Sequence, residues 1–88
     1  MPFFKRSPRK NKKYMVRTPS GNIIHFGDTR YQQYKDTTNL KLYKHLDHLD
    51  KDRRERYRAR ASKIIDKQGN LTYKDPNSAN YYAYNYLW

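Results

Sequence analysis

The stretch "KYMVRTPSGNIIHFG", Lys13 to Gly27, contains two short runs of strand-forming residues joined by a turn sequence. Tyr14 to Val16 form the first run and Ile23 to Phe26 the second, and β-branched and aromatic residues are typical of strands. Between them, residues 18–21 ("TPSG") place proline and glycine at the second and fourth positions of a β-turn. The stretch therefore predicts a β-hairpin. Because two strands alone are marginally stable in water, we expect other elements to cover one face of it.

The sequence after the hairpin predicts helices. Asp28 is placed as the N-cap of a helix that contains Tyr31 and Tyr34. Residues 39–65 have apolar residues at helical spacing, with a break near residues 47–50. Asp75 and Pro76 together predict the start of a last helix that runs toward Trp88.

The apolar residues of this chain are mainly aromatic. Among 88 residues there are eleven valines, isoleucines and leucines, against ten tyrosines, three phenylalanines and one tryptophan. Large aromatic side chains must therefore supply much of the buried area. We predict an α+β fold: one small domain over residues 14–88, in which two or three helices pack on the hairpin through an aromatic cluster. To that internal cluster we assign Tyr31, Tyr57, Tyr81, Tyr84 and Trp88.

The first 17 residues hold seven basic residues and no acidic one. With Pro2 and Pro8, residues 1–13 predict an extended basic arm outside the domain. Two interpretations stay open: a solvated tail, or a segment that binds nucleic acid or a protein partner. For partner contact we select Phe3 and Phe4 as apolar anchors, with the cations Lys5, Arg6, Arg9, Lys10, Lys12 and Lys13.

The segment "DKDRRERYRARASKI" (50–64) is the second basic region. On the predicted helix, Arg53 and Arg60 project onto the apolar side, where a guanidinium needs a charge-assisted partner. Asp28 and the carboxylate of Trp88 are the candidates, so Arg53, Arg60 and Asp28 are assigned structural roles. Arg54, Arg58 and Lys63 are assigned to the outer side, where they could follow the phosphates of a nucleic acid.

The aromatic segment at residues 81–88 has two interpretations. Tyrosines can stack on the bases of single-stranded nucleic acid, but such surfaces interleave rings with lysine and arginine. No basic residue follows Lys74. Packing in the core or at an interface is therefore the favoured interpretation.

Catalytic and metal-binding patterns are not found in the sequence. There is no cysteine and no glycine-rich phosphate loop, and no nucleophile has a base beside it. His45 and His48 lack a third ligand at metal-binding spacing. We expect a protein that is not an enzyme and that has no cofactor, no metal site and no membrane-spanning segment.

Four elements together resemble a family of short, basic, uncharacterised proteins of large DNA viruses, with relatives in tailed phages. They are Phe26-Gly27-Asp28 after the hairpin, the aromatic Tyr31, a helix of the type D-x-x-R-R-x-R-Y-x-x-R at residues 50–60, and the closing Leu87-Trp88. The resemblance covers residues 14–88, departs at residues 37–49 and leaves the arm out. It carries no known activity, but it implies a viral setting.

For a small basic protein that is not an enzyme, this setting implies a structural component of the virion, assembled in the host cell. With net charge +12, the chain is expected to associate with something acidic. We expect a minor capsid protein that bridges or cements larger coat subunits in a symmetric assembly. The alternative is a DNA-binding packaging or core protein that neutralises the viral genome.

Overall fold

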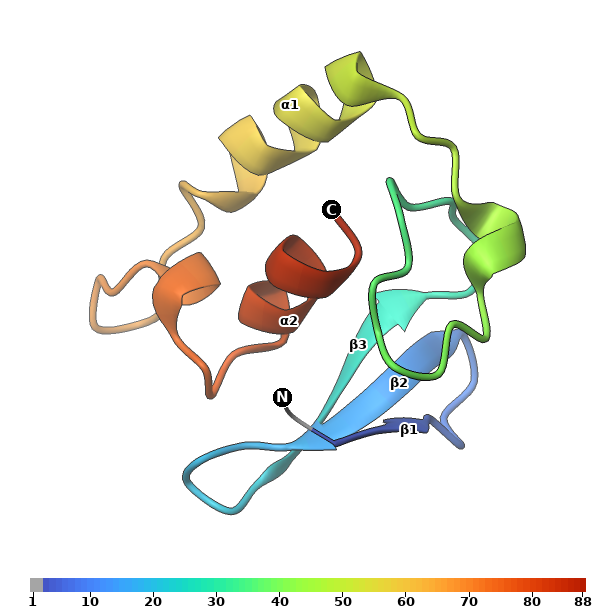
Figure 1. The fold of residues 1–88 in the computed structure, drawn as a ribbon. Coiled ribbons are helices and arrows are strands. Elements are labelled where there is room, and N and C mark those ends of the chain that lie inside the picture. Colours follow the sequence, from blue (N-terminus) through green and yellow to red (C-terminus); the bar gives the residue numbers. More distant parts are fainter. Residues whose placement is uncertain (1–2) are drawn as a thin grey trace.

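The structure is a computed structural model that describes residues 3–88. Its main elements are the strands β1 (Phe4–Arg6), β2 (Lys12–Arg17) and β3 (Ile23–Asp28) and the helices α1 (Lys51–Ala61) and α2 (Ala79–Tyr86). Two short 3-10 helices, η1 (Lys44–Leu46) and η2 (Thr72–Lys74), lie in the connections. The strands form one antiparallel sheet, and α2 lies between this sheet and α1 (Figure 1). The predicted α+β class is confirmed.

The hairpin forms as predicted. β2 and β3 pair with Tyr14 opposite Phe26 and Val16 opposite Ile24. The turn between them is closed by the amide of Gly21, which donates to the carbonyl of Thr18 at 2.9 Å. Gly21 has φ +90°, a conformation that glycine adopts without steric cost.

The segment expected to be an arm instead supplies a third strand. β1 pairs antiparallel with β2 and places Phe4 opposite Val16. The ring of Phe4 is 2% exposed and lies in the core. Burial of this ring and pairing with the edge of β2 hold residues 4–6 in the sheet, so the division between an arm and a domain at residue 13 is not seen among the described residues.

Helix α2 covers one face of the sheet and closes an aromatic core. Phe4, Phe26 and Tyr82 meet with ring centroids 5.5 to 6.2 Å apart. Tyr14, Val16 and Leu87 complete the buried cluster, so the predicted aromatic cluster is confirmed. The buried residue of α2 is Tyr82, and Leu87, just after the helix, is also buried. They lie one position from the expected Tyr81 and Trp88, which are partly buried, as is the expected Tyr84.

Two predicted helix starts are wrong because the aspartates expected to cap a helix each cap a turn. Asp28 ends β3 and accepts from the backbone amide of Arg30 at 2.9 Å, so it caps a turn and no helix follows it. Asp75 likewise caps a turn, and α2 begins later, with Ser78 as its N-cap. Asp50 is the N-cap of α1 and accepts from the amides of Asp52 and Arg53.

The predicted helix over residues 39–65 forms only in part. The break near residues 47–50 is confirmed, and α1 follows it as far as Ala61. Before the break, residues 39–43 are irregular, and Leu42 and Leu49 are exposed. Leu49 has φ +56°, which ends any helical path there.

Among the described residues, none of the helices combines the length and the apolar composition that crossing a membrane requires.

Candidate nucleic-acid interface

The fold gathers unopposed positive charge on the sheet. Residues 1–27 contain seven basic residues and no acidic one, whereas residues 28–88 contain thirteen basic and eight acidic residues. The sheet is built from residues 4–28. Six of its seven cations are exposed: Lys5, Arg6, Arg9, Lys10, Lys12 and Arg17.

These six cations have no acidic partner in the described part of the chain. Within residues 3–88 a single ion pair occurs, between Arg30 and Asp28, with 2.7 Å between Nη2 and Oδ2. This contact and the backbone amide of Arg30 hold the pKa of Asp28 at about 2, below its usual range. Asp28 is the acidic residue nearest in the sheet to Lys12, its cross-strand neighbour, and it is already paired.

The turn between β1 and β2 presents Arg9, Lys10 and Lys12 in a fixed arrangement. Ser7 is buried, and its hydroxyl accepts from the amide of Arg9 at 3.1 Å. The amide of Lys12 donates to the carbonyl of Arg9 at 3.2 Å, and Asn11 adopts φ +64° between them. The basic side chains therefore project from a closed, hydrogen-bonded turn.

His25 lies beside this turn on β3. Its Nδ1 is 2.7 Å from the hydroxyl of Ser7, which joins β3 to the start of the turn. Burial lowers the pKa of His25, and the nearby charges of Arg9 and Lys12 lower it further. His25 is accordingly neutral at physiological pH, and the positive potential here comes from lysine and arginine.

Lys13, the seventh cation, is not available to a partner. It is 2% exposed, and its Nζ donates to the carbonyl of Tyr31 at 3.0 Å and to Oε1 of Gln33. Burial lowers the pKa of Lys13 to about 8, although Asp36, Asp28 and Asp47 oppose the shift. The assignment of Lys13 to partner contact is corrected: it anchors residues 31–33 to the sheet.

A buried polar network continues from Lys13 and replaces the helix expected after Asp28. The hydroxyl of Tyr14 donates to Oδ2 of Asp36 at 2.5 Å and accepts from the amide of Leu42 at 2.9 Å. Asp36 also accepts from the hydroxyl of Thr38 at 2.6 Å, and Gln33 donates to Asp47 at 2.7 Å. Burial and the bond to Asp36 raise the pKa of Tyr14 to about 12. This network holds residues 31–47, which are irregular apart from η1, on the sheet.

The arginines of α1 have roles opposite to those predicted. Arg54 and Arg58 face α2, where their Nε atoms donate to the main-chain oxygen of Trp88 at 2.7 and 3.4 Å. Their guanidinium groups lie over the rings of Tyr34 and Tyr84, at 4.8 and 4.5 Å from the centroids. These two side chains are therefore structural. Lys63 is exposed, as its assignment requires.

Arg53 and Arg60, expected to be structural, are less constrained. Arg53 donates to Oε1 of Gln32 at 3.0 Å, whereas Arg60 is exposed. Neither makes a hydrogen bond or an ion pair with Asp28 or Trp88. The expected bond between an arginine of this helix and the main chain of Trp88 does form, but it comes from Arg54 and Arg58.

The remaining assigned aromatic residues differ in how deeply they lie in the fold. Tyr57 stacks on Trp88, with centroids 4.2 Å apart, and Tyr81 packs against the core cluster. Tyr84 contacts Tyr73, whose ring centroid is 4.9 Å away. Tyr31 is 65% exposed and does not belong to the internal cluster. Its backbone is held, because its carbonyl accepts from Lys13 and its amide donates to the carbonyl of Asp28.

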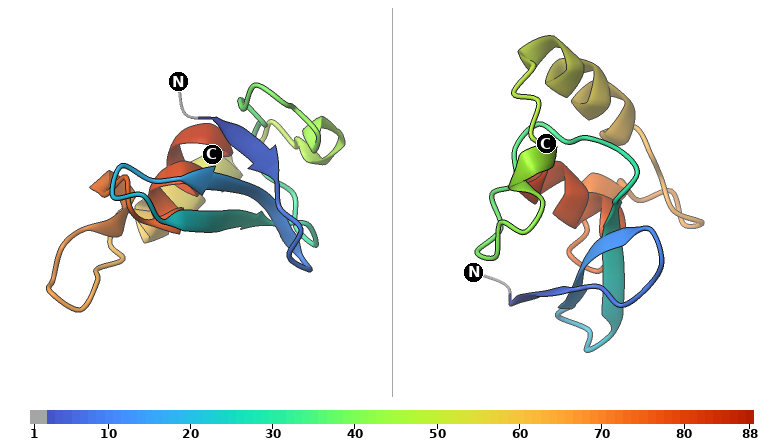
Figure 2. Two further views of the ribbon diagram at one scale, coloured as in Figure 1. Left: turned by 90° about the horizontal axis from the view of Figure 1, so that it is seen from below. Right: turned by 90° about the vertical axis from the view of Figure 1, so that its right-hand side faces the viewer.

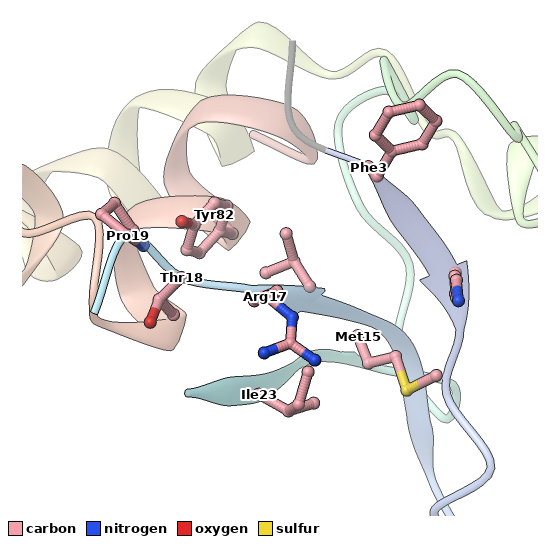
Figure 3. A pocket seen from close by; sticks show the side chains of 9 residues that line it. Phe3, Met15, Arg17, Thr18, Pro19, Ile23 and Tyr82 are labelled. Carbon is pink, nitrogen blue, oxygen red and sulfur yellow. The ribbon is translucent and has the colours of Figure 1, made fainter. Parts of the chain in front are cut away.

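Phe3 and Phe4 are neighbours in the chain but differ in how far their side chains are exposed. Phe4 is buried in the core, so its assignment as an anchor for a partner is corrected, whereas Phe3 is 85% exposed. Phe3 borders a groove of about 790 Å³ that is also lined by Met15, Arg17 and Ile23. Figure 3 shows Met15 and Arg17 on the side of β2 opposite to Tyr82 of α2.

No group of three histidine, aspartate or glutamate side chains in residues 3–88 is arranged to hold a metal ion. His48 is the one residue in that range whose buried side-chain nitrogen, Nε2, has no hydrogen-bond partner. Its ring centroid lies 5.1 Å from that of Trp88. His48 thus packs against the aromatic end of α2, with burial as the main cause of its lowered pKa.

Together these features describe a small basic α+β protein whose sheet carries unpaired cations. Residues 4–45 match a family of unknown function, DUF5754. The matched segment contains all three strands and most of the buried polar network. No curated protein and no solved structure matches the chain.

Proposed function

We propose that this protein is a non-enzymatic nucleic-acid-binding protein that neutralises packaged viral DNA. The observation that carries the proposal is the set of six exposed cations on the sheet, none of which has an acidic partner among the described residues. Phosphates attract such a set without regard to sequence, and they displace counterions on binding. The viral setting rests on the sequence resemblance.

The structure alters the relative support for the two roles expected from the sequence. An arm that crosses to a neighbouring coat subunit requires residues 1–13 to be separate from the domain. Residues 4–6 instead pair with β2, and the apolar anchor Phe4 is buried. The cations remain exposed, so the support for phosphate binding is unaffected by this change.

The experiment is a titration of the full chain into fluorescently labelled DNA, followed by anisotropy at several salt concentrations. The variant Arg9→Gln, Lys10→Gln, Lys12→Gln removes three cations from the β1–β2 turn. If all three contact phosphate, the slope of log K against log salt becomes about 2.7 less steep. The matched control, Lys35→Gln, Lys44→Gln, Lys67→Gln, removes three exposed cations elsewhere and should leave most of the affinity.

Equal losses in the two triple variants would show that binding follows net charge alone, and would contradict a defined interface. If the unmodified protein does not bind DNA at physiological salt, the proposed function is wrong.

A second candidate function, a minor capsid protein that cements coat subunits, is favoured by a different observation. Phe3 and Ile23 are 85% and 49% exposed and border the same groove of about 790 Å³, which an apolar side chain of a coat subunit could fill. Disruption of virus particles followed by mass spectrometry of each fraction separates the two roles. A protein that follows the coat fraction is a capsid component, and one that follows the genome is a packaging protein.

A further inference from the structure

We propose that the uncovered face of the sheet is an interface for B-form duplex DNA and lies in its major groove. This face, called the open face below, consists of Lys5, Met15, Arg17, Ile23 and His25. The proposal rests on the nucleic-acid-binding function above, and it adds the class of nucleic acid and the surface that recognises it.

Strand alternation creates the open face. Successive side chains of a strand point to opposite faces. Tyr14, Val16 and Phe26 point toward α2 and are at most 2% exposed. Their neighbours Met15, Arg17 and His25 therefore point the other way. The left view of Figure 2 shows the strands in front of α2, with no helix over the face nearer the viewer.

The charge of the open face matches a polyanion. Lys5 and Arg17 lie on it, and the strands supply no acidic residue before Asp28, which is paired with Arg30. Arg9, Lys10 and Lys12 extend the positive charge past one end of the strands. A ligand that follows β2 would meet cations at both ends of the strand, and Lys5 beside its middle.

The chemistry of the open face disfavours single-stranded nucleic acid. Proteins that bind single strands on a sheet stack the bases on aromatic rings that the strands expose. Here the rings of β2 and β3, Tyr14 and Phe26, are buried under α2. On the open face the strands carry Met15 and Ile23, which are not planar, and a single ring, the partly buried imidazole of His25, which is held by Ser7. The exposed ring of Phe3 lies just before β1, outside the strands.

The dimensions of the sheet favour the major groove of B-form DNA. Strands lie about 4.8 Å apart and rise about 3.3 Å per residue, so the hairpin of β2 and β3 is a ribbon roughly 20 Å long. The three-residue strand β1 lies along the outer edge of β2 and widens part of this ribbon by one strand. The major groove of B-DNA, about 12 Å wide, admits a two-stranded ribbon. The major groove of A-form RNA is too deep and narrow for side chains to enter.

The side chains then divide by position. Arg17 projects from the turn end of the ribbon, where it pairs with Ile23, and a guanidinium placed there can donate to O6 and N7 of guanine. One of its nitrogens is steadied by the carbonyl of Gly21 at 3.2 Å. The opposite end of the ribbon, beside the β1–β2 turn, places three cations toward the phosphates at the rim of the groove: Arg9, Lys10 and Lys12.

The experiment compares three ligands of one sequence: a 20-base-pair DNA duplex, one of its strands alone and the corresponding RNA duplex. Binding to the full chain is measured by anisotropy at about 150 mM salt, where the counterion contribution is reduced. We expect the DNA duplex to bind at least about tenfold more tightly than the other two ligands, since only it offers an accessible major groove.

Two charge-matched variants locate the interface. Met15→Glu places a carboxylate in the centre of the open face, and Ala59→Glu places one on the exposed side of α1. Met15→Glu should weaken DNA binding by about tenfold or more, while Ala59→Glu should change it by less than about threefold, because a like charge matters most at close range. Arg17→Gln, which keeps the stem of an exposed side chain, provides a second measurement if Met15→Glu fails to fold, and it should lose about fivefold or more.

The outcomes separate the two proposals. Tight binding to the single strand or the RNA duplex, or equal losses in Met15→Glu and Ala59→Glu, overturns the major-groove inference and leaves nucleic-acid binding in place. Absence of binding to all three ligands overturns the proposed function, and this inference with it.

Discussion

The indole of Trp88 lies flat on the ring of Tyr57, with ring centroids 4.2 Å apart and ring planes 10° from parallel. Tyr57 belongs to α1 and Trp88 follows α2, so this stack joins the two helices. Arg54 and Arg58, on the same side of α1, donate to the main-chain oxygen of Trp88. The contact between the helices is therefore both aromatic and polar.

Replacing Arg54 by methionine should destabilise the fold. The change removes a bond of 2.7 Å to Trp88 and the contact with the ring of Tyr34. We expect the free energy of unfolding to fall by about 1–3 kcal/mol, measured by urea denaturation. Arg56→Met, on the exposed side of the helix, should change it by less than about 0.5 kcal/mol. Similar values for the two variants would contradict the role given to Arg54.

Replacing Gly27 by alanine should cost more than replacing Gly21. Both glycines have positive φ, +77° and +90°, where alanine is strained by about 1–2 kcal/mol. At Gly27 the new methyl would also lie 3.0 Å from Leu87 Cδ1 and from Lys13 Cδ, whereas at Gly21 it meets nothing. Thermal denaturation should show a loss of about 2–5 kcal/mol for Gly27→Ala and about 1–2 kcal/mol for Gly21→Ala. Equal losses would mean that Leu87 does not pack on this strand.

Removing the hydroxyl of Tyr14 tests the buried polar network. In Tyr14→Phe, Asp36 loses a donor and the amide of Leu42 loses an acceptor. The free energy of unfolding should fall by about 1–3 kcal/mol, because buried polar groups are left unpaired. Tyr43→Phe is the control: its ring lies 5.3 Å from that of Tyr14, but its hydroxyl makes no hydrogen bond to another described residue. That variant should stay within about 0.5 kcal/mol of the unmodified protein.

The lowered pKa of the buried Lys13 should make the stability of the fold depend on pH. Its pKa in the folded state is about 8, against 10.5 in the unfolded chain, so the unfolded chain binds more protons between these values. Stability should therefore rise with pH from about pH 8 to about pH 10.5. Tyr14 acts in the opposite direction, because its raised pKa of about 12 makes stability fall above its ordinary value of 10.0.

Urea denaturation at about pH 7.5 and pH 9.5 measures the contribution of Lys13 before Tyr14 ionises. The unmodified protein should gain stability between these two pH values, and Lys13→Met should not. A gain of equal size in both proteins would assign the dependence to another group.

The hairpin could be predicted from sequence because everything that specifies it is local. The alternation from Tyr14 to Arg17 and the turn at Thr18 to Gly21 lie within a few residues of each other. β1 has no such signal: it is three residues long, and its place in the sheet depends on burial of Phe4 against α2, about 80 residues away in the chain. The basic residues around Phe4 favour an arm when only the local sequence is considered, since the contact that buries Phe4 is with a distant part of the chain.

The periodicity of the sequence places the arginines of α1 on the wrong sides because it predicts the wrong phase for this helix. Leu42, Leu46 and Leu49 set the expected apolar stripe, but none of them is in an α-helix. With these three residues excluded, Ala61 and Tyr57 set the phase, and residues 54 and 58 then lie on the buried side. A break in a helix resets its phase, and the periodicity of the sequence alone does not reveal by how much.

The buried polar network could not be found by pattern. Lys13 is one of seven basic residues in a basic stretch, and nothing in its neighbours distinguishes it from Lys12. Its burial depends on Gln33 and on the carbonyl of Tyr31, about 20 residues away. Such a site becomes visible only when the path of residues 29–47 is known.

The contact between Phe4 and Tyr86, whose rings meet with centroids 4.7 Å apart, has a consequence for synthesis of the chain. The ribosome releases the sheet first, and until residues 79–87 emerge its apolar face is exposed to the cell. Bringing together two residues so far apart in the chain also lowers the chain entropy before packing contacts stabilise the fold. The core should therefore form only after residues 79–87 have left the ribosome, and until then the uncovered sheet is the state most exposed to aggregation or to capture by a chaperone.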